Sequence, residues 1–338
     1  MKKIIALGLA LVLAAGATQA LSSEVNVYSA RKEALIKPLL DRFSNQTGIK
    51  VNLVTGKADA LLKRLTSEGA NSPADLLITT DAGRLHRAKS AGVLQPVSSE
   101  ILNNAIPASY RDPEGYWHGL SVRARVITYV KDKVDPENLS RYEDLADPRW
   151  KGRICIRSSG NIYNQSLVAS LLEANGEEAT QSWANGLVEN MARNPKGGDR
   201  DQVKAAAAGV CDLAVVNTYY LGAMINSDDE KQREAAARMG VLWPNQEGRG
   251  AHVNVSGAGV TQSAKHREEA IKLLEFLVSE ESQAWYASVN HEYPVRKGVE
   301  WSDTLKQWGQ FKADDLNLSR LGINNPEAVR LMDRAGWK

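Results

Sequence analysis

Three tyrosines are the residues of this chain whose type and spacing most directly suggest chemistry. Tyr219 and Tyr220 are adjacent in "NTYYLG", and Tyr163 precedes Tyr219 by 56 residues in "GNIYNQS". Neighbouring side chains of a strand point to opposite faces, so the pair can share one site only at a turn or in the first turn of a helix. Asn217 and Thr218 form a good helix N-cap, which favours the helical position. A tyrosine in a cleft ordinarily packs and makes one hydrogen bond, whereas its deprotonated oxygen is a hard anionic ligand.

The two cysteines of the chain lie at equal distances before these tyrosines. Cys155 is eight residues before Tyr163, and Cys211 is eight residues before Tyr219. In an oxidising compartment an even pair predicts a disulfide, and the alternative is two buried free thiols. If the two strands that carry them pair in register, the bridge at one end fixes Tyr163 and Tyr219 near each other at the other end.

The first twenty residues have the pattern of a cleaved export signal. Lys2 and Lys3 precede the apolar run 4–17, and small Ala20 stands at the expected cleavage point. The run is shorter than the about 20 residues that span a membrane. Without the two lysines the formal charge of +2 falls to zero, which gives no electrostatic basis for binding nucleic acid. We expect a soluble periplasmic protein that is a monomer.

Strand-like and helix-like segments alternate along the mature chain. The runs "EVNVYSA", "KVNLVTG" and "ADLLITT" are separated by two amphipathic segments, which predicts a βαβαβ unit with a parallel sheet. A second set begins near "RVITYV", and Ser263 precedes a strongly periodic helix. The length exceeds what one core usually supports, so we expect two α/β lobes. No strand is followed by a GxGxxG loop, so a dinucleotide site is not expected.

Four segments resemble a known family. "VNVYSARKE", "GLSVRARVITY", "RSSGNIYNQSLVAS" and "CDLAVVNTYYLG" are similar, in order and separation, to the periplasmic ferric-ion-binding proteins of iron ABC transporters. The resemblance runs from about Val25 to the C-terminus. It implies a type II periplasmic binding protein fold, with two α/β lobes that close about a hinge over the ligand. We place the lobes at 22–121 plus 250–297 and at 122–249 plus 298–338, with crossings near Ser121–Arg125 and Arg249–Val253.

The resemblance also implies the ligand and the partner. Tyr163, Tyr219 and Tyr220 would bind Fe³⁺ as phenolates, and the protein would deliver the ion to an inner-membrane ABC permease. Fe³⁺ is small, hard and highly charged, which suits anionic oxygen, and three phenolates neutralise its charge. Several relatives place a His-Tyr pair after "YS-R", where this chain has Lys32 and Glu33. Glu33 is therefore a candidate fourth ligand as well as an ordinary residue at a helix N-terminus.

An iron ion with three protein ligands has an incomplete coordination sphere. Relatives of the three-tyrosine kind fill it with a small anion, typically carbonate, so the resemblance implies carbonate or bicarbonate here. An anion needs fixed positive groups, for which Arg31 and Arg123 are the candidates and Arg125 is the alternative to Arg123. Tyr28, at the end of the first expected strand, is expected to face the cleft as a structural or supporting residue.

Two other functions stay open. The same fold accommodates many ligands, so the cleft could bind an organic or oxyanion ligand such as a phosphonate, thiamine or a polyamine. A metal-dependent exported enzyme is the third hypothesis, and the motifs argue against it. The five histidines show no HExxH or zinc spacing, no GxSxG frame is present, and His252 near the second crossing is interpreted as structural. We expect a binding protein and not an enzyme.

Overall fold

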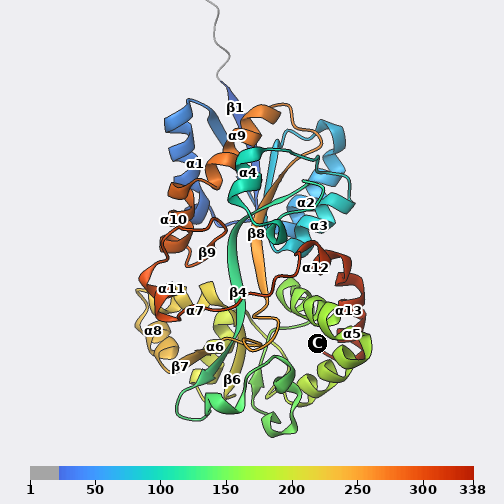
Figure 1. Cartoon of the computed structure of the whole chain (residues 1–338), viewed down its shortest axis with the longest axis vertical. Helices are drawn as coiled ribbons and strands as arrows, with labels where there is room; N and C mark the ends of the chain where they lie inside the picture. Colours follow the sequence, from blue (N-terminus) through green and yellow to red (C-terminus); the bar gives the residue numbers. More distant parts are fainter. Residues whose placement is uncertain (1–22) are drawn as a thin grey trace, which may run out of the picture.

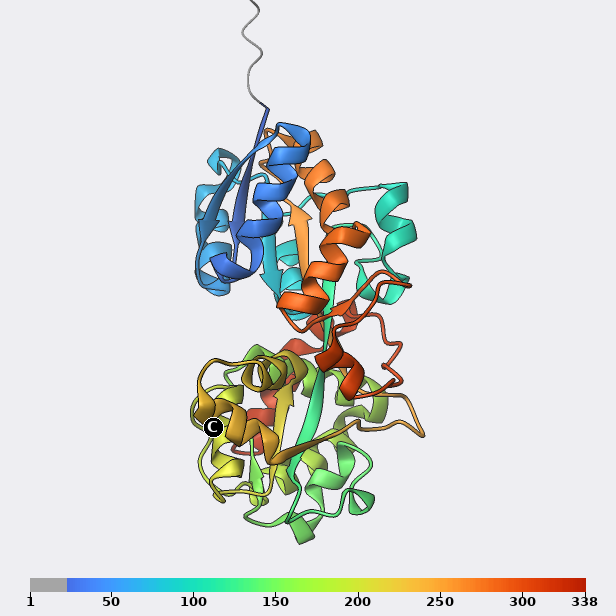
Figure 2. The ribbon, with the colours of Figure 1, turned by 90° about the vertical axis from the view of Figure 1, so that its left-hand side faces the viewer.

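The computed structural model describes residues 23–338, so the expected signal peptide at 1–20 lies outside the described residues. The chain forms two α/β lobes stacked along its longest axis (Figure 1). A single path of hydrogen-bonded strands runs through both lobes in the order β2-β1-β3-β8-β4-β6-β5. Seen from the side, the lobes meet at a narrow waist through which β4 passes (Figure 2). Within residues 23–338 no helix has the length and apolar character needed to cross a membrane.

The N-terminal lobe is the part built on the first three strands. β1 (Glu24–Ser29) pairs in parallel with β2 (Lys50–Thr55) and with β3 (Leu76–Thr80), which confirms the expected βαβαβ unit. β8 (Val253–Val260) then runs antiparallel to β3. The α-helices of this lobe that the structure describes are α1 (Glu33–Thr47), α2 (Ala58–Glu68), α3 (Ala82–Ser90), α4 (Glu100–Ala105), α9 (Arg267–Leu277) and α10 (Glu280–Val289).

The helix expected from Ser263 onward begins later than its periodicity predicts. The backbone N–H groups of Lys265 and His266 donate hydrogen bonds to Asp75 Oδ1 over 2.8 and 2.9 Å. This buried carboxylate holds the segment in a turn, and α9 begins only at Arg267.

The C-terminal lobe is built around the lower half of β4 (His118–Val130). β6 (Leu213–Asn217) and β7 (Met239–Leu242) pair antiparallel with β4, and the short β5 (Ile154–Cys155) pairs in parallel with β6. The helices of this lobe are α5 (Ile162–Glu189), α6 (Asp199–Ala207), α7 (Thr218–Ile225) and α8 (Glu230–Ala237). β6 runs directly into α7, because Asn217 is the last residue of the strand and Thr218 is the first residue of the helix.

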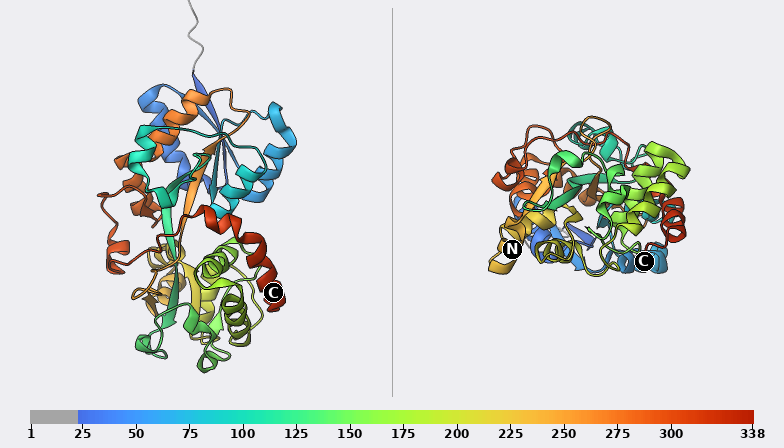
Figure 3. Two further views of the ribbon diagram at one scale, coloured as in Figure 1. Left: turned by 45° about the vertical axis from the view of Figure 1, so that its right-hand side comes forward. Right: turned by 90° about the horizontal axis from the view of Figure 1, so that it is seen from below.

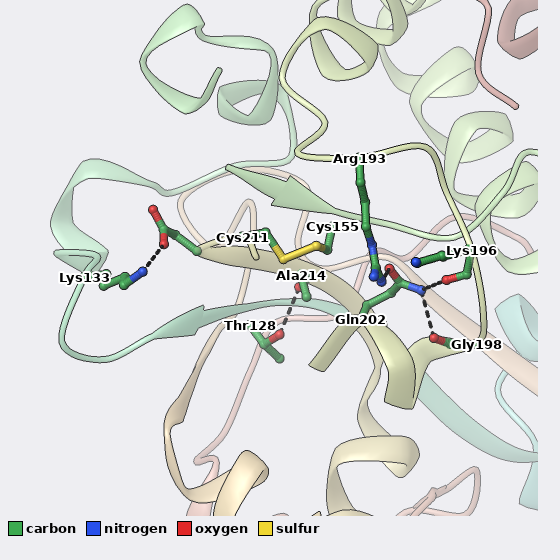
Figure 4. The surroundings of a disulfide bond; sticks show 10 residues. Thr128, Lys133, Cys155, Arg193, Lys196, Gly198, Gln202, Cys211 and Ala214 are labelled. Carbon is green, nitrogen blue, oxygen red and sulfur yellow. Dashed lines mark hydrogen bonds and ion pairs between the residues drawn. A yellow bond between two sulfur atoms is a disulfide. The ribbon is translucent and has the colours of Figure 1, made fainter. Parts of the chain in front are cut away.

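The expected disulfide joins the two neighbouring strands of this lobe. Cys155 at the end of β5 and Cys211 just before β6 are bonded, with Cα atoms 5.9 Å apart. Figure 4 shows the bridge beside the β4–β6 pair, where the Thr128 hydroxyl donates to the Ala214 carbonyl over 3.0 Å. The predicted disulfide is therefore confirmed in this structure, and it ties together the strands that lead toward the tyrosines.

Two long strands form the crossing between the lobes. β4 pairs with β8 as far as Ala124, opposite Val253, and pairs with β6 from Arg125, opposite Asn217. The strand therefore leaves one lobe and enters the other between Ala124 and Arg125. Because the side chains around this point lie at the base of both lobes, the buried Arg123 and Arg125 stand where the lobes meet.

The C-terminal segment passes between the lobes a third time. β9 (Tyr293–Pro294) pairs with β4, and the chain then descends through α11 (Asp303–Gln307). It returns at Leu318, whose N–H donates to the Ser109 carbonyl over 2.9 Å, and α12 (Ser319–Ile323) packs against both α3 and α5. α13 (Asn325–Arg334) then packs on α5, as Figure 3 shows. The expectation placed 298–338 in the C-terminal lobe, whereas α12 contacts both lobes.

Candidate metal centre

The three tyrosines occupy the first turns of two helices. Tyr219 and Tyr220 follow Thr218, the first residue of α7, so the helical position expected for the pair is the one observed. Tyr163 is the second residue of α5, and its N–H donates to the Asn161 side chain over 3.1 Å. Helix N-termini favour negative charge, which suits a phenolate in either place. The Asn217 side chain does not cap α7, because its Oδ1 accepts from Arg125 Nη1 over 2.9 Å instead.

The tyrosine side chains converge on one cavity. The Tyr219 hydroxyl donates to the Tyr163 hydroxyl over 3.2 Å, and the rings of Tyr219 and Tyr220 lie 4.3 Å apart. All three line a cavity of about 460 Å³ between the lobes. The remaining lining residues come from both lobes and include Arg31, Lys32, Thr80, Arg200, Asn226, Asn290, His291 and Glu292.

The environment keeps the phenols of Tyr219 and Tyr220 protonated when no cation is bound. Burial, then the neighbouring Tyr163 and Tyr220, raises the pKa of Tyr219 well above its ordinary value. Burial, then Tyr163 and Asp199, raises the pKa of Tyr220 to about 12. A bound cation reverses this preference, because it coordinates the deprotonated oxygen. Tyr219 and Tyr220 are therefore neutral alone and become anionic only together with a positive ion.

Two buried arginines present free N–H donors near the tyrosines. Arg31 lines the cavity and donates through Nη2 to Glu292 over 2.6 Å, while its Nε and Nη1 have no partner among the described residues. Arg123 donates through Nη1 to Ser256 over 3.2 Å and leaves Nε and Nη2 without a partner there. Its guanidinium carbon lies 5.9 Å from the centre of the Tyr163 ring. Buried guanidinium groups with free donors are suited to an anion.

The structure makes Arg125 a poor alternative to Arg123. Both terminal nitrogens of Arg125 are engaged in the C-terminal lobe, where Nη1 donates to Asp199 and Asn217 and Nη2 donates to Asn164 over 2.6 Å, and only its Nε has no partner among the described residues. Its role is to fix the start of α7 and the end of β6. Arg123, which points to the same side of β4, leaves a terminal nitrogen, Nη2, free as well as Nε.

Three residues named in the sequence analysis lie away from the cavity. Glu33 is the exposed first residue of α1 and is not part of the cavity lining. Tyr28 is buried, and its hydroxyl donates to Glu68 over 3.1 Å, so it does not face the cleft as expected. His252 is buried beside Arg125, Arg249 and Arg123, and burial, followed by these arginines, lowers its pKa to about 3.

The structure also shows residues that the motifs did not indicate. Asp81, at the end of β3, accepts a hydrogen bond at Oδ1 from the Ser166 hydroxyl of α5 over 2.7 Å, which joins the two lobes. Asp81 has a φ of 83° and caps α3 through the N–H of Gly83. In the sequence, only its position directly after an expected strand could have identified Asp81 as a candidate residue of the site. No sequence pattern could have identified Asn290 and His291, because they belong to a loop that only tertiary contacts bring to the cavity.

The donor set of the cavity is unusual for a metal site. Among residues 23–338 no group of three or more His, Cys, Asp or Glu side chains is placed to hold a metal ion. The three phenol oxygens instead provide hard donors that a small, highly charged cation prefers. Their three negative charges would offset the charge of such a cation and reduce the cost of burying it.

Comparisons with known proteins agree on one group of relatives. Residues 71–317 match the family model described as bacterial extracellular solute-binding protein. The chain is 53% identical to iron uptake protein A1 of Synechocystis over 93% of its own length and 88% of that protein. It is 31% identical to the Fe(3+)-binding periplasmic protein of Serratia marcescens, over 96% of this chain and 94% of that one.

Solved structures give the same answer for the fold. The Trichodesmium protein (IdiA, FutA) in complex with iron and citrate ligands superposes with a TM-score of 0.92 at 52% identity, covering 94% of this chain and 100% of that one. The ferric binding protein from Campylobacter jejuni superposes with a TM-score of 0.88 at 42% identity, covering 93% and 100%. These matches confirm the two-lobed solute-binding fold.

Proposed function

Because the chain belongs to the bacterial extracellular solute-binding protein family, and its relatives are iron uptake and ferric-iron-binding proteins, we propose that it captures Fe³⁺ in the cavity between its lobes. Tyr163, Tyr219 and Tyr220 are the proposed protein ligands. The observation that carries the proposal is the convergence of their three side chains on one cavity, with the hydroxyls of Tyr163 and Tyr219 3.2 Å apart.

The proposed ion accounts for a feature that would otherwise be unfavourable. Without a cation, burial and the neighbouring tyrosines raise the pKa of Tyr219 and Tyr220 and so oppose ionisation of both phenols. A trivalent cation converts them to phenolates and neutralises them together. Glu33 is not included among the ligands, because it lies outside the cavity lining.

A small anion completes the proposed coordination sphere. Arg31 and Arg123 would hold it, since both are buried and carry N–H groups without partners among the described residues. Carbonate or bicarbonate is the first candidate. Citrate is the second, because the Trichodesmium relative was solved with iron and citrate and the cavity of about 460 Å³ is large enough for an organic ligand.

Delivery follows from the two-lobed architecture. The tyrosines belong to the C-terminal lobe and Arg31 to the N-terminal lobe, so iron and anion together would bridge the cleft. Their binding would shift an open–closed equilibrium by their differential affinity for the closed form. We propose that the protein acts in the periplasm as a monomer and that an inner-membrane ABC permease recognises the closed form. Its role is binding and not catalysis.

A visible absorption titration tests the proposal. Phenolate-to-iron charge transfer should turn the colourless iron-free protein orange-red as ferric citrate is added, with saturation at one ion per chain. A protein that stays colourless and instead binds a phosphonate, thiamine or a polyamine would show that the cleft serves the alternative ligand class.

A further inference from the structure

The wall of the cavity that faces the tyrosines contains an amide with no partner. Asn290 follows the last residue of α10, lines the cavity and is only 6% exposed. Neither its side-chain oxygen nor its side-chain nitrogen has a hydrogen-bond partner among the described residues. Buried polar groups are almost always paired in proteins, so this amide is a candidate for pairing with a ligand.

The loop that carries Asn290 is rigidly held. The N–H groups of Asn290 and Glu292 both donate to the Tyr286 carbonyl over 3.2 Å, and His291 between them has a φ of 53°. His291 packs against Gly222 of α7, where a side-chain Cβ on the glycine would lie 2.8 Å from that of the histidine. The loop is therefore fixed from both lobes.

Arg31 shares the same support. Its guanidinium lies 5.4 Å from the centre of the Tyr286 ring and pairs with Glu292, which also accepts from Ser121 over 2.9 Å. Tyr286 and Glu292 thus position both the free donors of Arg31 and the free amide of Asn290. Arg31 and Asn290 line one cavity from the N-terminal lobe, opposite the tyrosines of the C-terminal lobe.

The two side chains differ in what they require of a ligand. A guanidinium offers only donors, so its free Nε and Nη1 require acceptor oxygens, preferably anionic ones. An amide offers a donor and an acceptor, so satisfying Asn290 requires a ligand that both accepts and donates. An oxyanion with every oxygen deprotonated would satisfy the Asn290 nitrogen and leave its oxygen unpaired.

We propose that Arg31 and Asn290 form an anion subsite that selects an oxyanion carrying an O–H group, with Asn290 as the specificity-determining residue. Bicarbonate and 2-hydroxycarboxylates share this chemistry. This inference depends on the proposed function in one respect, namely that the iron and the anion bind in the same cavity. It adds to that function a chemical requirement on the anion, which neither the arginines nor the tyrosines impose.

Calorimetric titration of the iron-free protein tests the requirement directly. Glycolate carries a carboxylate and an O–H, whereas acetate and methoxyacetate lack the O–H and bracket glycolate in size. We expect the wild-type protein to bind glycolate about tenfold more tightly than either analogue, the effect of roughly one hydrogen bond to a charged ligand. Equal binding of the three carboxylates would overturn the proposal.

A parallel titration with bicarbonate identifies the source of the anion. Tight binding of bicarbonate that depends on Asn290 assigns the subsite to an inorganic anion, and such binding of glycolate alone assigns it to a hydroxy acid. Binding of neither anion in an Asn290-dependent manner rules the subsite out.

Substitutions locate the effect. Asn290→Leu keeps a similar volume without polar atoms, and Asn290→Ala removes the side chain, so both should abolish the preference for glycolate. Both should leave the melting temperature of the iron-free protein unchanged or higher, because they remove buried groups without partners. Asn226→Ala is the matched control, because the Asn226 nitrogen in the same cavity already donates to the Gly222 carbonyl and Thr304. A preference that survives in Asn290→Leu and Asn290→Ala contradicts the assignment.

The outcome is separable from that of the proposed function, because these titrations contain no iron. A coloured ferric complex without any preference for an O–H group refutes the subsite alone. A preference that depends on Asn290 in a protein that never becomes coloured supports the subsite and refutes iron capture.

Discussion

The hydroxyls of Tyr219 and Tyr163 lie 3.2 Å apart, although the two residues belong to different helices of the C-terminal lobe. The strands that precede these helices, β5 and β6, are neighbours and are bridged by Cys155–Cys211. Strand pairing and disulfide thus bring the two phenols together, and the start of α7 adds Tyr220 to the same cavity. The predictions below follow from this arrangement.

Replacing a single tyrosine of the cluster by phenylalanine removes one oxygen and leaves the ring packing in place. We expect Tyr219→Phe and Tyr220→Phe each to weaken ferric binding by at least about 100-fold, because loss of a ligand should exceed the 10–100-fold effect of losing a supporting contact. Tyr28→Phe is the matched control, since its hydroxyl bonds Glu68 away from the cavity. Visible absorption titrations with ferric citrate measure the affinity of the cluster variants and of the control. Full colour and affinity in both cluster variants would falsify the ligand assignment.

Iron binding should release protons and weaken in acid. Burial, followed by neighbouring groups, raises the pKa of Tyr220 to about 12 and that of Tyr219 well above 10, so both are neutral at pH 7 without iron. Each phenolate formed on binding releases one proton, so apparent affinity should rise by up to about tenfold per pH unit for each phenolate and fall as pH decreases. Proton release on loading at pH 7 can be followed with an indicator dye in weakly buffered solution. Loading without proton release is the contrary result.

The anion should be required for tight loading, with Arg123 as one of its holders. After stripping in acid and exchange into bicarbonate-free buffer, we expect poor loading from a ferric chelate and recovery on adding bicarbonate. Arg123→Ala should impair that recovery, because it removes buried donors next to Tyr163. Glu33→Gln should behave as wild type, because Glu33 is exposed outside the cavity. Anion-independent loading of the wild type, or severe loss in Glu33→Gln, speaks against this picture.

The disulfide should stabilise the lobe that carries the tyrosines. Intact mass should be two hydrogens below the reduced form, and reduction should lower the free energy of unfolding by about 2–4 kcal/mol, since the bridge closes a loop of 56 residues. Urea unfolding with and without reductant measures the difference. Ferric affinity should fall on reduction as well, because the strands leading to Tyr163 and Tyr219 lose their link. Thiols that alkylate freely without reductant would rule the bridge out.

The contact between Ser166 and Asp81 should favour closure of the cleft. Ser166→Ala removes a 2.7 Å hydrogen bond between the lobes without disturbing the positive φ of Asp81 or its cap on α3. We expect ferric affinity to fall by about five- to tenfold, the effect of one hydrogen bond, while the visible spectrum of the saturated complex stays unchanged. Small-angle X-ray scattering should show a larger radius for the iron-free variant. A shifted absorption maximum would instead indicate that Ser166 acts on the iron site itself.

Local patterns in the sequence determined the elements of this protein and much of the ligand set. The βαβαβ unit follows from alternating apolar runs, and Gly48, with a φ of 73°, ends α1 because glycine adopts this left-handed conformation without strain. The helical position of Tyr219 and Tyr220 was expected from the residues before them and is observed, although the Asn217 side chain bonds Arg125 and does not cap α7. Equal spacing from two cysteines indicated that Tyr163 and Tyr219 would meet if the strands paired in register; the two hydroxyls do meet, but Cys155 is opposite Ala214 and not Cys211, so the equal spacing is not the reason.

Tertiary structure alone decided which residues complete the cavity. Arg123 and Arg125 lie on the same side of β4, and only their partners show that both terminal nitrogens of Arg125 are taken, by Asp199 and other C-terminal-lobe acceptors, while Arg123 keeps Nη2 free. Asn290 reaches the cavity because a loop of the N-terminal lobe packs against α7, far away in sequence. Glu33 was a candidate by position, yet the first turn of α1 leaves it in solvent. The periodicity of apolar residues determines which face of a helix or strand is buried. Which buried polar group stays without a protein partner, and can therefore pair with a ligand, is determined only when the two lobes approach each other.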